Sequence, residues 1–176
     1  MDERDRARVR AAIEAAEGGA PHPDEADRLI RRLLEGSRTI AIVGASPRAD
    51  RPSHGVLRFL ADAGWTVLPV NPMPAALEGG VAGHRCHPTL RAAAASLPAG
   101  TRIDLVDVFR RSEECAEIAR EAVAVGAGAL WLQLGVISPE AASIAAAAAM
   151  PFVQDRCPAI EAPRLGIAGP AERPSA

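Results

Sequence analysis

A short apolar segment followed by a turn of small residues constrains this chain more than any other feature of its sequence. The residues from Ile40 to Val43 are all apolar and predict a buried strand, and Gly44-Ala45-Ser46-Pro47 follows directly. A helix is expected to begin at Ser53, which we predict as its N-cap. Such a turn directs free backbone N–H groups and the positive end of the helix dipole toward one point. The sequence therefore predicts a phosphate-binding corner and a nucleotide or coenzyme as its ligand.

Strand and helix patterns alternate from Thr39 onward, which is typical of an α/β protein. Short apolar runs joined by amphipathic helices imply right-handed crossovers and a doubly wound, mostly parallel sheet. Pro69 is expected at the carboxyl end of its strand, because proline is a poor interior strand residue. Beyond the first strand, we expect strands at Thr66–Val70, Arg85–His87 (short), Ile103–Phe109, Ala129–Leu132 and Phe152–Val153. Helices are expected to begin near Ser53, Thr89, Ser112 and Ser138.

We divide the chain into three parts. Residues 1–36 are expected to form a helical extension of two short helices, the second capped by Asp24 and ending at Gly36. Residues 37–166 form the α/β domain, and residues 167–176, rich in Pro, Gly, Ser and Ala, are expected to be a disordered tail. The apolar faces of the two helices are Val9, Ile13 and Ala16 in the first and Ile30, Leu33 and Leu34 in the second.

Composition and charge exclude several classes of function. The chain has 176 residues, enough for one domain with a sizeable core. A net charge of −2, with basic and acidic residues interleaved, argues against a nucleic-acid partner. The N-terminus lacks the apolar segment of a secretory signal, and Ala141–Met150 is too short to span a membrane. The odd number of cysteines, three, suits a reducing compartment, so we expect a cytoplasmic protein.

In a doubly wound sheet the ligand binds beyond the carboxyl ends of the strands, where the direction of winding reverses. A dinucleotide site would show G-x-G-x-x-G after the first strand and an acidic residue after the second. Here the turn is G-A-S-P-R and the second strand ends in Asn71-Pro72, so both parts of that pattern fail. No P-loop sequence occurs either. The segments expected to line the crevice are Gly44–Arg48, Asn71-Pro72, Phe109–Arg111 and Gln133–Gly135.

Arginine is the cation available to hold phosphate groups in this chain. The sequence contains no lysine, so all 20 of its basic residues are arginine. Arginine suits bidentate contacts with phosphate oxygens. The arginines close to the predicted crevice are Arg48, Arg51, Arg110 and Arg111.

Five ordered sequence blocks point to a family. They are G-A-S-P-R-A-D-R-P-S-H, V-L-P-V-N-P, D-V-F-R-R-S-E-E, W-L-Q-L-G-V and V-Q-D-R-C. The chain thereby resembles the small stand-alone CoA-binding proteins of bacteria and archaea, which are similar to the N-terminal CoA-binding domain of the succinyl-CoA synthetase alpha subunit. The resemblance extends from about Thr39 to about Leu165. It implies a Rossmann-like fold with CoA bound across the strand ends.

The resemblance also implies which residues contact the coenzyme. The turn of Gly44, Ala45, Ser46 and Pro47 would hold the diphosphate. Beside it we expect contacts from Arg48, Arg51, Ser53 and His54, although a solvent-facing His54 is an equal alternative. The residues expected to flank the nucleotide and the pantetheine arm are Asn71, Pro72, Val108, Phe109, Arg110, Gln133, Leu134 and Gly135.

Other reactive side chains have simpler interpretations. His84, Cys86 and His87 lie close in sequence but lack a fourth zinc ligand, which favours an edge-strand loop. Cys157 is a candidate nucleophile, or a thiol that pairs with the sulfur of CoA, but no His or Asp partner lies nearby in sequence. A packed structural thiol is therefore favoured. Asp107, at a buried strand end, is expected to accept hydrogen bonds from loop amides.

The expected function is binding of CoA or acyl-CoA by a carrier, sensor or regulatory module. No convincing nucleophile, acid–base pair or metal cluster is evident, so catalysis by this chain alone is not expected. Two alternatives stay open: an oxidoreductase that binds NAD(P), and a CoA-binding component of an acyl-CoA ligase that needs a partner subunit. A homodimer formed through the N-terminal helices or a sheet edge is a further hypothesis.

Overall fold

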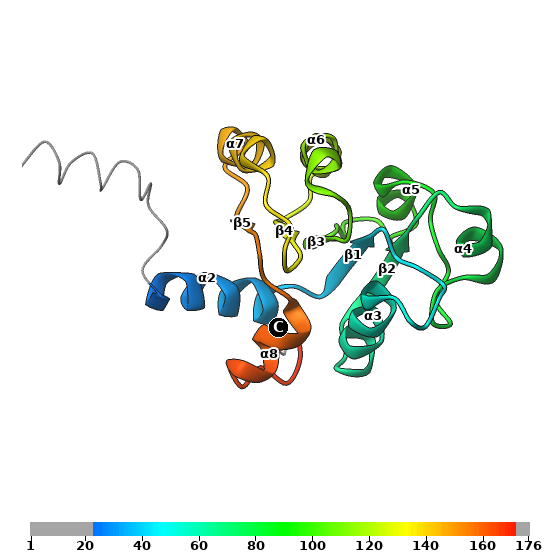
Figure 1. Cartoon of the computed structure of the whole chain (residues 1–176), viewed down its shortest axis with the longest axis horizontal. Helices are drawn as coiled ribbons and strands as arrows, with labels where there is room; N and C mark the ends of the chain where they lie inside the picture. Colours follow the sequence, from blue (N-terminus) through cyan, green and yellow to red (C-terminus); the bar gives the residue numbers. More distant parts are fainter. Residues whose placement is uncertain (1–22, 172–176) are drawn as a thin grey trace, which may run out of the picture.

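A five-stranded parallel sheet runs through residues 23–171, the part of the chain that this computed structural model describes (Figure 1). The strand order is β2-β1-β3-β4-β5, so the chain starts at an inner strand and winds outward in both directions. The direction of winding reverses between β1 and β3. This arrangement confirms the doubly wound, Rossmann-like α/β fold. The strands are β1 (Thr39–Val43), β2 (Thr66–Val70), β3 (Leu105–Val108), β4 (Leu130–Leu132) and β5 (Phe152–Val153).

Helices cover both faces of the sheet and make three layers (Figure 1). The face that includes Ile42 and Trp131 packs against α2 (Pro23–Gly36), α3 (Pro52–Asp62) and α8 (Pro158–Arg164). The opposite face, with Val106 and Leu130, packs against α5 (Leu90–Ala95), α6 (Cys115–Ala124) and α7 (Pro139–Ala147). The short helix α4 (Pro74–Gly79) follows β2. Because both faces are covered, the inner strands are apolar along nearly their whole length.

The outer strand β2 accommodates a proline. Pro69 is the fourth of the five residues of the strand, near its carboxyl end as the sequence predicts. It pairs with Ile42 on one side, and on the other side its carbonyl accepts a hydrogen bond from His87 N at 2.8 Å. A proline is tolerated there because β2 lies at the edge of the sheet. The short strand expected at Arg85–His87 is only an isolated bridge between Val70 and His87.

Two helix starts follow the local sequence and two do not. Thr89 and Ser138 cap α5 and α7, each accepting a hydrogen bond from the third residue of its helix. The predicted cap at Ser53 is wrong: Arg51 occupies the cap position of α3, and Pro52 begins the helix. At Ser112 the expected helix starts as a short 3-10 turn, η1 (Ser112–Glu114), which leads into α6.

The two ends of the described chain pack against the same side of the molecule. Helix α2 begins at Pro23, just before the predicted cap Asp24, and buries Ile30, Leu33 and Leu34 as expected. Ile167 is buried, and Ala171 N donates to Glu35 O at 2.9 Å, so residues 167–171 are packed although their composition predicts a disordered tail. The helix expected to carry Val9, Ile13 and Ala16 lies outside the described residues, as do residues 172–176. Within residues 23–171 no helix is both long and apolar enough to cross a membrane.

Candidate functional site

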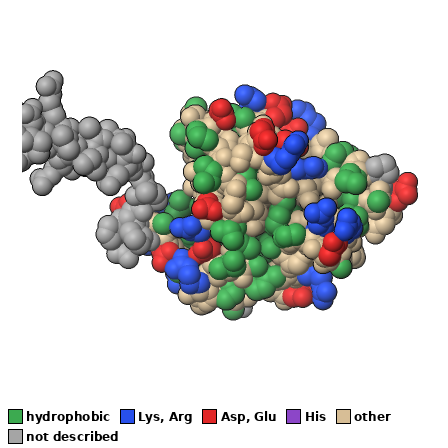
Figure 2. Space-filling view, viewed as in Figure 1, with side chains coloured by type: hydrophobic (Ala, Val, Ile, Leu, Met, Phe, Trp, Pro, Cys, Tyr) green, Lys and Arg blue, Asp and Glu red, His purple; other side chains and the backbone are tan. Residues whose placement is uncertain are grey.

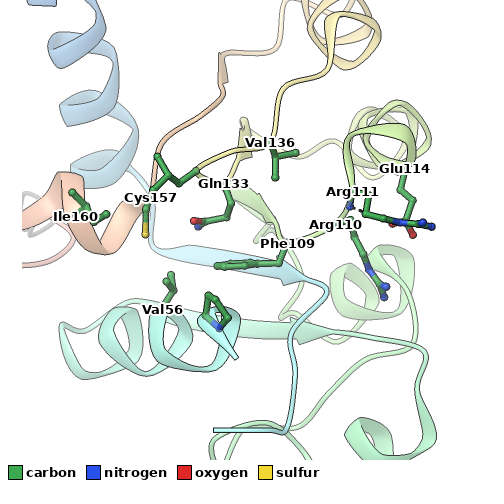
Figure 3. A pocket seen from close by; sticks show the side chains of 11 residues that line it. Val56, Phe109, Arg110, Arg111, Glu114, Gln133, Val136, Cys157 and Ile160 are labelled. Atoms are coloured by element: carbon green, nitrogen blue, oxygen red, sulfur yellow. Dashed lines mark hydrogen bonds and ion pairs between the residues drawn. The ribbon is translucent and has the colours of Figure 1, made fainter. Parts of the chain in front are cut away.

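A cleft opens at the carboxyl ends of the strands, between α3 and α8 (Figure 3). Its volume is about 740 Å³, within the range of sites that hold small molecules and cofactors. Pro52 and Val56 of α3 form one wall, and Cys157 and Ile160 at the start of α8 form the other. The remaining lining residues follow β3 (Phe109, Arg110, Arg111 and Glu114) and β4 (Gln133, Leu134 and Val136).

The cleft is apolar at one end and charged at the other. In Figure 3, Ile160 and Cys157 lie at one end and Arg110 and Arg111 at the other, with the Phe109 ring between them. Figure 2 shows apolar side chains gathered over the face near α8 and α3, with arginine and acidic side chains around them. The cleft therefore suits a ligand that has an anionic group at one end and a less polar arm at the other.

The turn after β1 takes its shape from glycine. Gly44 has a φ of 86°, a conformation that other residues adopt only with strain. A Cβ atom there would lie 2.4 Å from Phe109 O and 3.2 Å from Arg110 Nε. The turn thus lies directly beside the residues that follow β3, but Gly44, Ala45, Ser46 and Pro47 do not line the cleft itself.

Most N–H groups of this turn already have acceptors within the protein. Gly44 N donates to Val70 O at 2.9 Å, Ser46 N to Ser53 Oγ at 3.1 Å, and Arg48 N to Ser46 Oγ at 3.3 Å. Only the N–H of Ala45 lacks such an acceptor within the described residues. The open cradle of backbone N–H groups expected from the sequence is therefore largely closed by internal hydrogen bonds.

Three side chains that the sequence predicts as coenzyme contacts hold the turn in place. His54 Nδ1 lies 3.2 Å from Ser46 O, and Ser53 Oγ accepts from Ser46 N, so two side chains of α3 contact the backbone carbonyl and N–H of Ser46. Asn71 is buried and donates through Nδ2 to Ala45 O at 2.7 Å, while its Oδ1 accepts from Met73 N at 3.0 Å. The roles of Ser53, His54 and Asn71 in the structure are thus structural support for the turn.

The four candidate arginines differ in how available they are. Arg48 forms an ion pair with Asp50 at 2.7 Å, and Arg111 one with Glu114 at 3.3 Å. These pairs are largely solvent-exposed and contribute little to stability. Arg110 has no ion-pair or hydrogen-bond partner within residues 23–171 and is half-buried at the charged end of the cleft. Arg51 is likewise unpaired there and exposed at the start of α3. Arg110 is therefore the cation best placed to meet an anion in the cleft, while Arg51 does not line it and precedes Pro52, which does.

A buried polar pair lies at the floor of the cleft. Gln133 Nε2 lies 2.9 Å from each carboxylate oxygen of Asp107. Asp107 is fully buried, and burial raises the pKa of its carboxyl to about 7, although the hydrogen bonds from Gln133 and from the Val108 backbone oppose the rise. Asp107 was expected to accept from loop amides; its acceptor role is seen, with the side-chain amide of Gln133 as the donor.

Of the sixteen residues predicted for the site, those that line the cleft are Phe109, Arg110, Gln133 and Leu134. Val108 is fully buried in the sheet and Pro72 is exposed. Gly135 is exposed, and its N–H donates to Asp155 Oδ1 at 2.8 Å. Pro52, Val56, Glu114, Val136 and Ile160 line the cleft and were not predicted. Their contribution depends on how α3 and α8 pack, and no local sequence signal marks it.

The three cysteines are buried and unpaired. Burial raises the pKa of all three thiols, that of Cys115 to about 11, where Glu114 and Glu113 add to the effect. Only Cys157 lines the cleft. Cys86 and His87 are also buried, and no cluster of three or more His, Cys, Asp or Glu side chains in the described chain is placed to hold a metal ion.

Comparison with known proteins identifies the family. A family profile described as CoA binding domain matches residues 38–163. The chain belongs to this CoA-binding domain family. The uncharacterized protein YneT of Bacillus subtilis (strain 168) is similar to it, with 32% identity over 136 residues, covering 77% of this chain and 92% of YneT.

Solved structures of similar sequence share its fold. Prb, a redesigned form of the PH1109 protein, superposes with a TM-score of 0.70 at 33% identity, covering 80% of this chain and 92% of Prb. A Thermus thermophilus protein, cell-free ID.343, has a TM-score of 0.68 at 34% identity, covering 79% of this chain and 98% of its own. A hypothetical protein from Pyrococcus horikoshii OT3 gives 0.68 at 32% identity, with 79% and 91% coverage.

Proposed function

We propose that this chain binds CoA or an acyl-CoA in the cleft between α3 and α8. The observation that carries the proposal is a cleft, charged at one end and apolar at the other, at the switch point of a CoA-binding domain. CoA has the matching chemistry, since its nucleotide carries phosphates and its pantetheine arm is far less polar. The phosphates face Arg110 and Arg51, and the arm runs past Phe109 and Gln133 toward Cys157.

The function we propose is binding without chemistry of its own, as in a carrier, sensor or regulatory module. Cys157 is the one thiol or hydroxyl among the residues that line the cleft. Burial raises the pKa of that thiol, which keeps it protonated and a poor nucleophile at neutral pH. The carboxylate nearest to the charged end, Glu114, is paired with Arg111. Within residues 23–171, neither group is hydrogen-bonded to a histidine or other side chain that could serve as the base or acid of such catalysis.

Native mass spectrometry of the freshly purified full chain tests the choice of ligand. A CoA-sized adduct, or a CoA-sized mass increase after addition of CoA, is expected. An adduct with NAD(H) or NADP(H) in place of CoA would contradict the proposal and favour the oxidoreductase alternative.

Titration of arginine variants tests the placement. Arg110→Ala should raise the Kd for CoA about tenfold, because one charge-assisted contact with a phosphate is lost. Arg58→Ala is the matched control, since Arg58 is exposed on α3 and does not line the cleft. Equal affinities for CoA in the two variants would show that the phosphates lie elsewhere.

A further inference from the structure

A buried carboxylate lies directly beneath the lining of the cleft. Asp107 sits on β3 with its side chain fully enclosed, and its side-chain partner is Gln133, which follows β4 and lines the cleft. Gln133 Nε2 is 2.9 Å from both carboxylate oxygens of Asp107. The binding of phosphates described above makes no use of this pair.

The Asp107 carboxylate decides which way the amide of Gln133 faces. An ionised carboxylate offers only acceptors, whereas a glutamine amide has one donor end and one acceptor end. The Nε2 end therefore faces Asp107, and the Oε1 end is turned away from it. A neutral amide in place of Asp107 would allow Gln133 to adopt either orientation.

The Oε1 atom of Gln133 is the part of this pair that a ligand can reach. Within residues 23–171 it has no hydrogen-bond partner, yet no side-chain N or O atom of this part of the chain is both unpartnered and fully enclosed. The atom is therefore open to the cleft, although Gln133 as a whole is only 6% exposed. Phe109, Val136 and Cys157 line the same cleft and are labelled around Gln133 in Figure 3, and none of these side chains offers a strong donor. A ligand that covers Oε1 without donating to it would leave a buried acceptor unsatisfied, which weakens binding.

We infer that Asp107 is a positioning residue that holds Gln133 with Oε1 toward the cleft, where it accepts a hydrogen bond from an amide N–H of the ligand's arm. This inference rests on the proposed function, because the pantetheine arm of CoA carries two amide N–H groups and its nucleotide carries none. In Figure 3 Gln133 lies between the arginines and the apolar end, where an arm leaving the phosphates would pass. The pair thereby selects an amide-containing arm over a hydrocarbon arm.

Two ligands separate this role from a structural one: CoA, and 3′-phospho-ADP, which is the CoA nucleotide without its arm. At about pH 8.5, Asp107→Asn should weaken CoA binding about tenfold, since the Gln133 amide can then turn a donor toward the arm. Binding of 3′-phospho-ADP should change less than about twofold. The double variant D107N/Q133E should recover CoA affinity, because the introduced amide donates to one oxygen of the introduced carboxylate and the other oxygen faces the cleft.

The outcomes distinguish the inference from the proposed function. If the wild-type chain does not bind CoA, the proposed function fails and the inference with it. If the wild type binds CoA but D107N either keeps its affinity or loses affinity for both ligands equally, the positioning role alone is refuted. A loss confined to CoA, with recovery in the double variant, supports the role. Should D107N not fold, Gln133→Met removes the acceptor at similar size, and the same selective loss of CoA affinity is expected.

Discussion

The buried carboxyl of Asp107 should make this protein more stable as the pH falls through neutrality, the opposite of the usual effect of a paired carboxylate. Burial raises the pKa of Asp107 from 3.8 to about 7, despite its hydrogen bonds with Gln133 and the Val108 backbone. In the unfolded chain the pKa returns to its ordinary value. Between these two pKa values the folded protein holds a proton that the unfolded chain releases, so protonation favours the folded state.

The size of the effect follows from the two pKa values. Each tenfold change in proton affinity corresponds to about 1.4 kcal/mol, so keeping Asp107 charged in the fold costs about 4 kcal/mol well above pH 7. That cost declines as the pH falls through 7 and is gone below about pH 4. From about pH 8 to about pH 5, this group alone should raise the free energy of unfolding by about 2–3 kcal/mol.

Urea unfolding of the wild type and of Asp107→Asn at these two pH values isolates the contribution, because all other titrating groups are shared. The free energy of unfolding of the wild type should rise by about 2–3 kcal/mol relative to D107N as the pH is lowered. Asp62→Asn serves as the control, since Asp62 is exposed on α3 and should follow the wild type at both pH values. If the difference in the free energy of unfolding between wild type and D107N does not change with pH, a buried carboxyl that titrates near neutrality is refuted.

Three further predictions concern the turn, a helix cap and the thiol. In urea unfolding, Gly44→Ala should lower the free energy of unfolding by about 2 kcal/mol or more, because the φ of Gly44 is 86° and the added Cβ would meet Phe109 O. Gly55→Ala is the control: the added Cβ would lie in open space on α3, so this change should raise the free energy of unfolding by up to about 1 kcal/mol. Ser138→Ala should lower the free energy of unfolding by about 1 kcal/mol through loss of its cap. A thiol reagent should modify Cys157 before the other two cysteines, because Cys157 lines the cleft, and bound CoA should slow that reaction. A labelling rate that CoA leaves unchanged would contradict the proposal that the pantetheine arm reaches this cysteine.

The strands are predictable from this sequence because each is a short apolar run buried by helices on both sides. Thr66–Val70 and Phe152–Val153 have the bounds expected from the sequence. The third strand is shorter than its apolar run, Ile103–Phe109, and ends at Val108. Apolar character alone cannot mark that end, because Phe109 is also apolar and its N–H still donates to Val43 O at 2.8 Å, although the residue lies beyond β3 and lines the cleft.

The walls of the cleft could not be predicted, since they depend on how helices pack after the sheet has formed. Val56 and Ile160 are ordinary apolar helix residues in the sequence, yet they face one cleft because α3 and α8 cover the same face of the sheet. The role of Ser53 was missed for a related reason. A serine before a helix usually caps it, but here Pro52 begins the helix and the Ser53 hydroxyl accepts from Ser46 N instead.

The hydrogen bonds that shape the turn after β1 also change how an anion can be held there. A phosphate cradled by backbone N–H groups would have to displace the Ser53 hydroxyl from Ser46 N, and Asn71 fixes the same turn through Ala45 O. Replacing satisfied internal hydrogen bonds yields little net free energy. The guanidinium of Arg110 has no ion-pair or hydrogen-bond partner in the described part of the chain, so it requires no such exchange. We therefore expect that side chains, more than a glycine-rich backbone, determine ligand choice in this chain, which would explain how the proposed ligand can be held without the dinucleotide pattern. Substitutions of Arg110 should then change CoA affinity more than substitutions of Ser53 that preserve the fold.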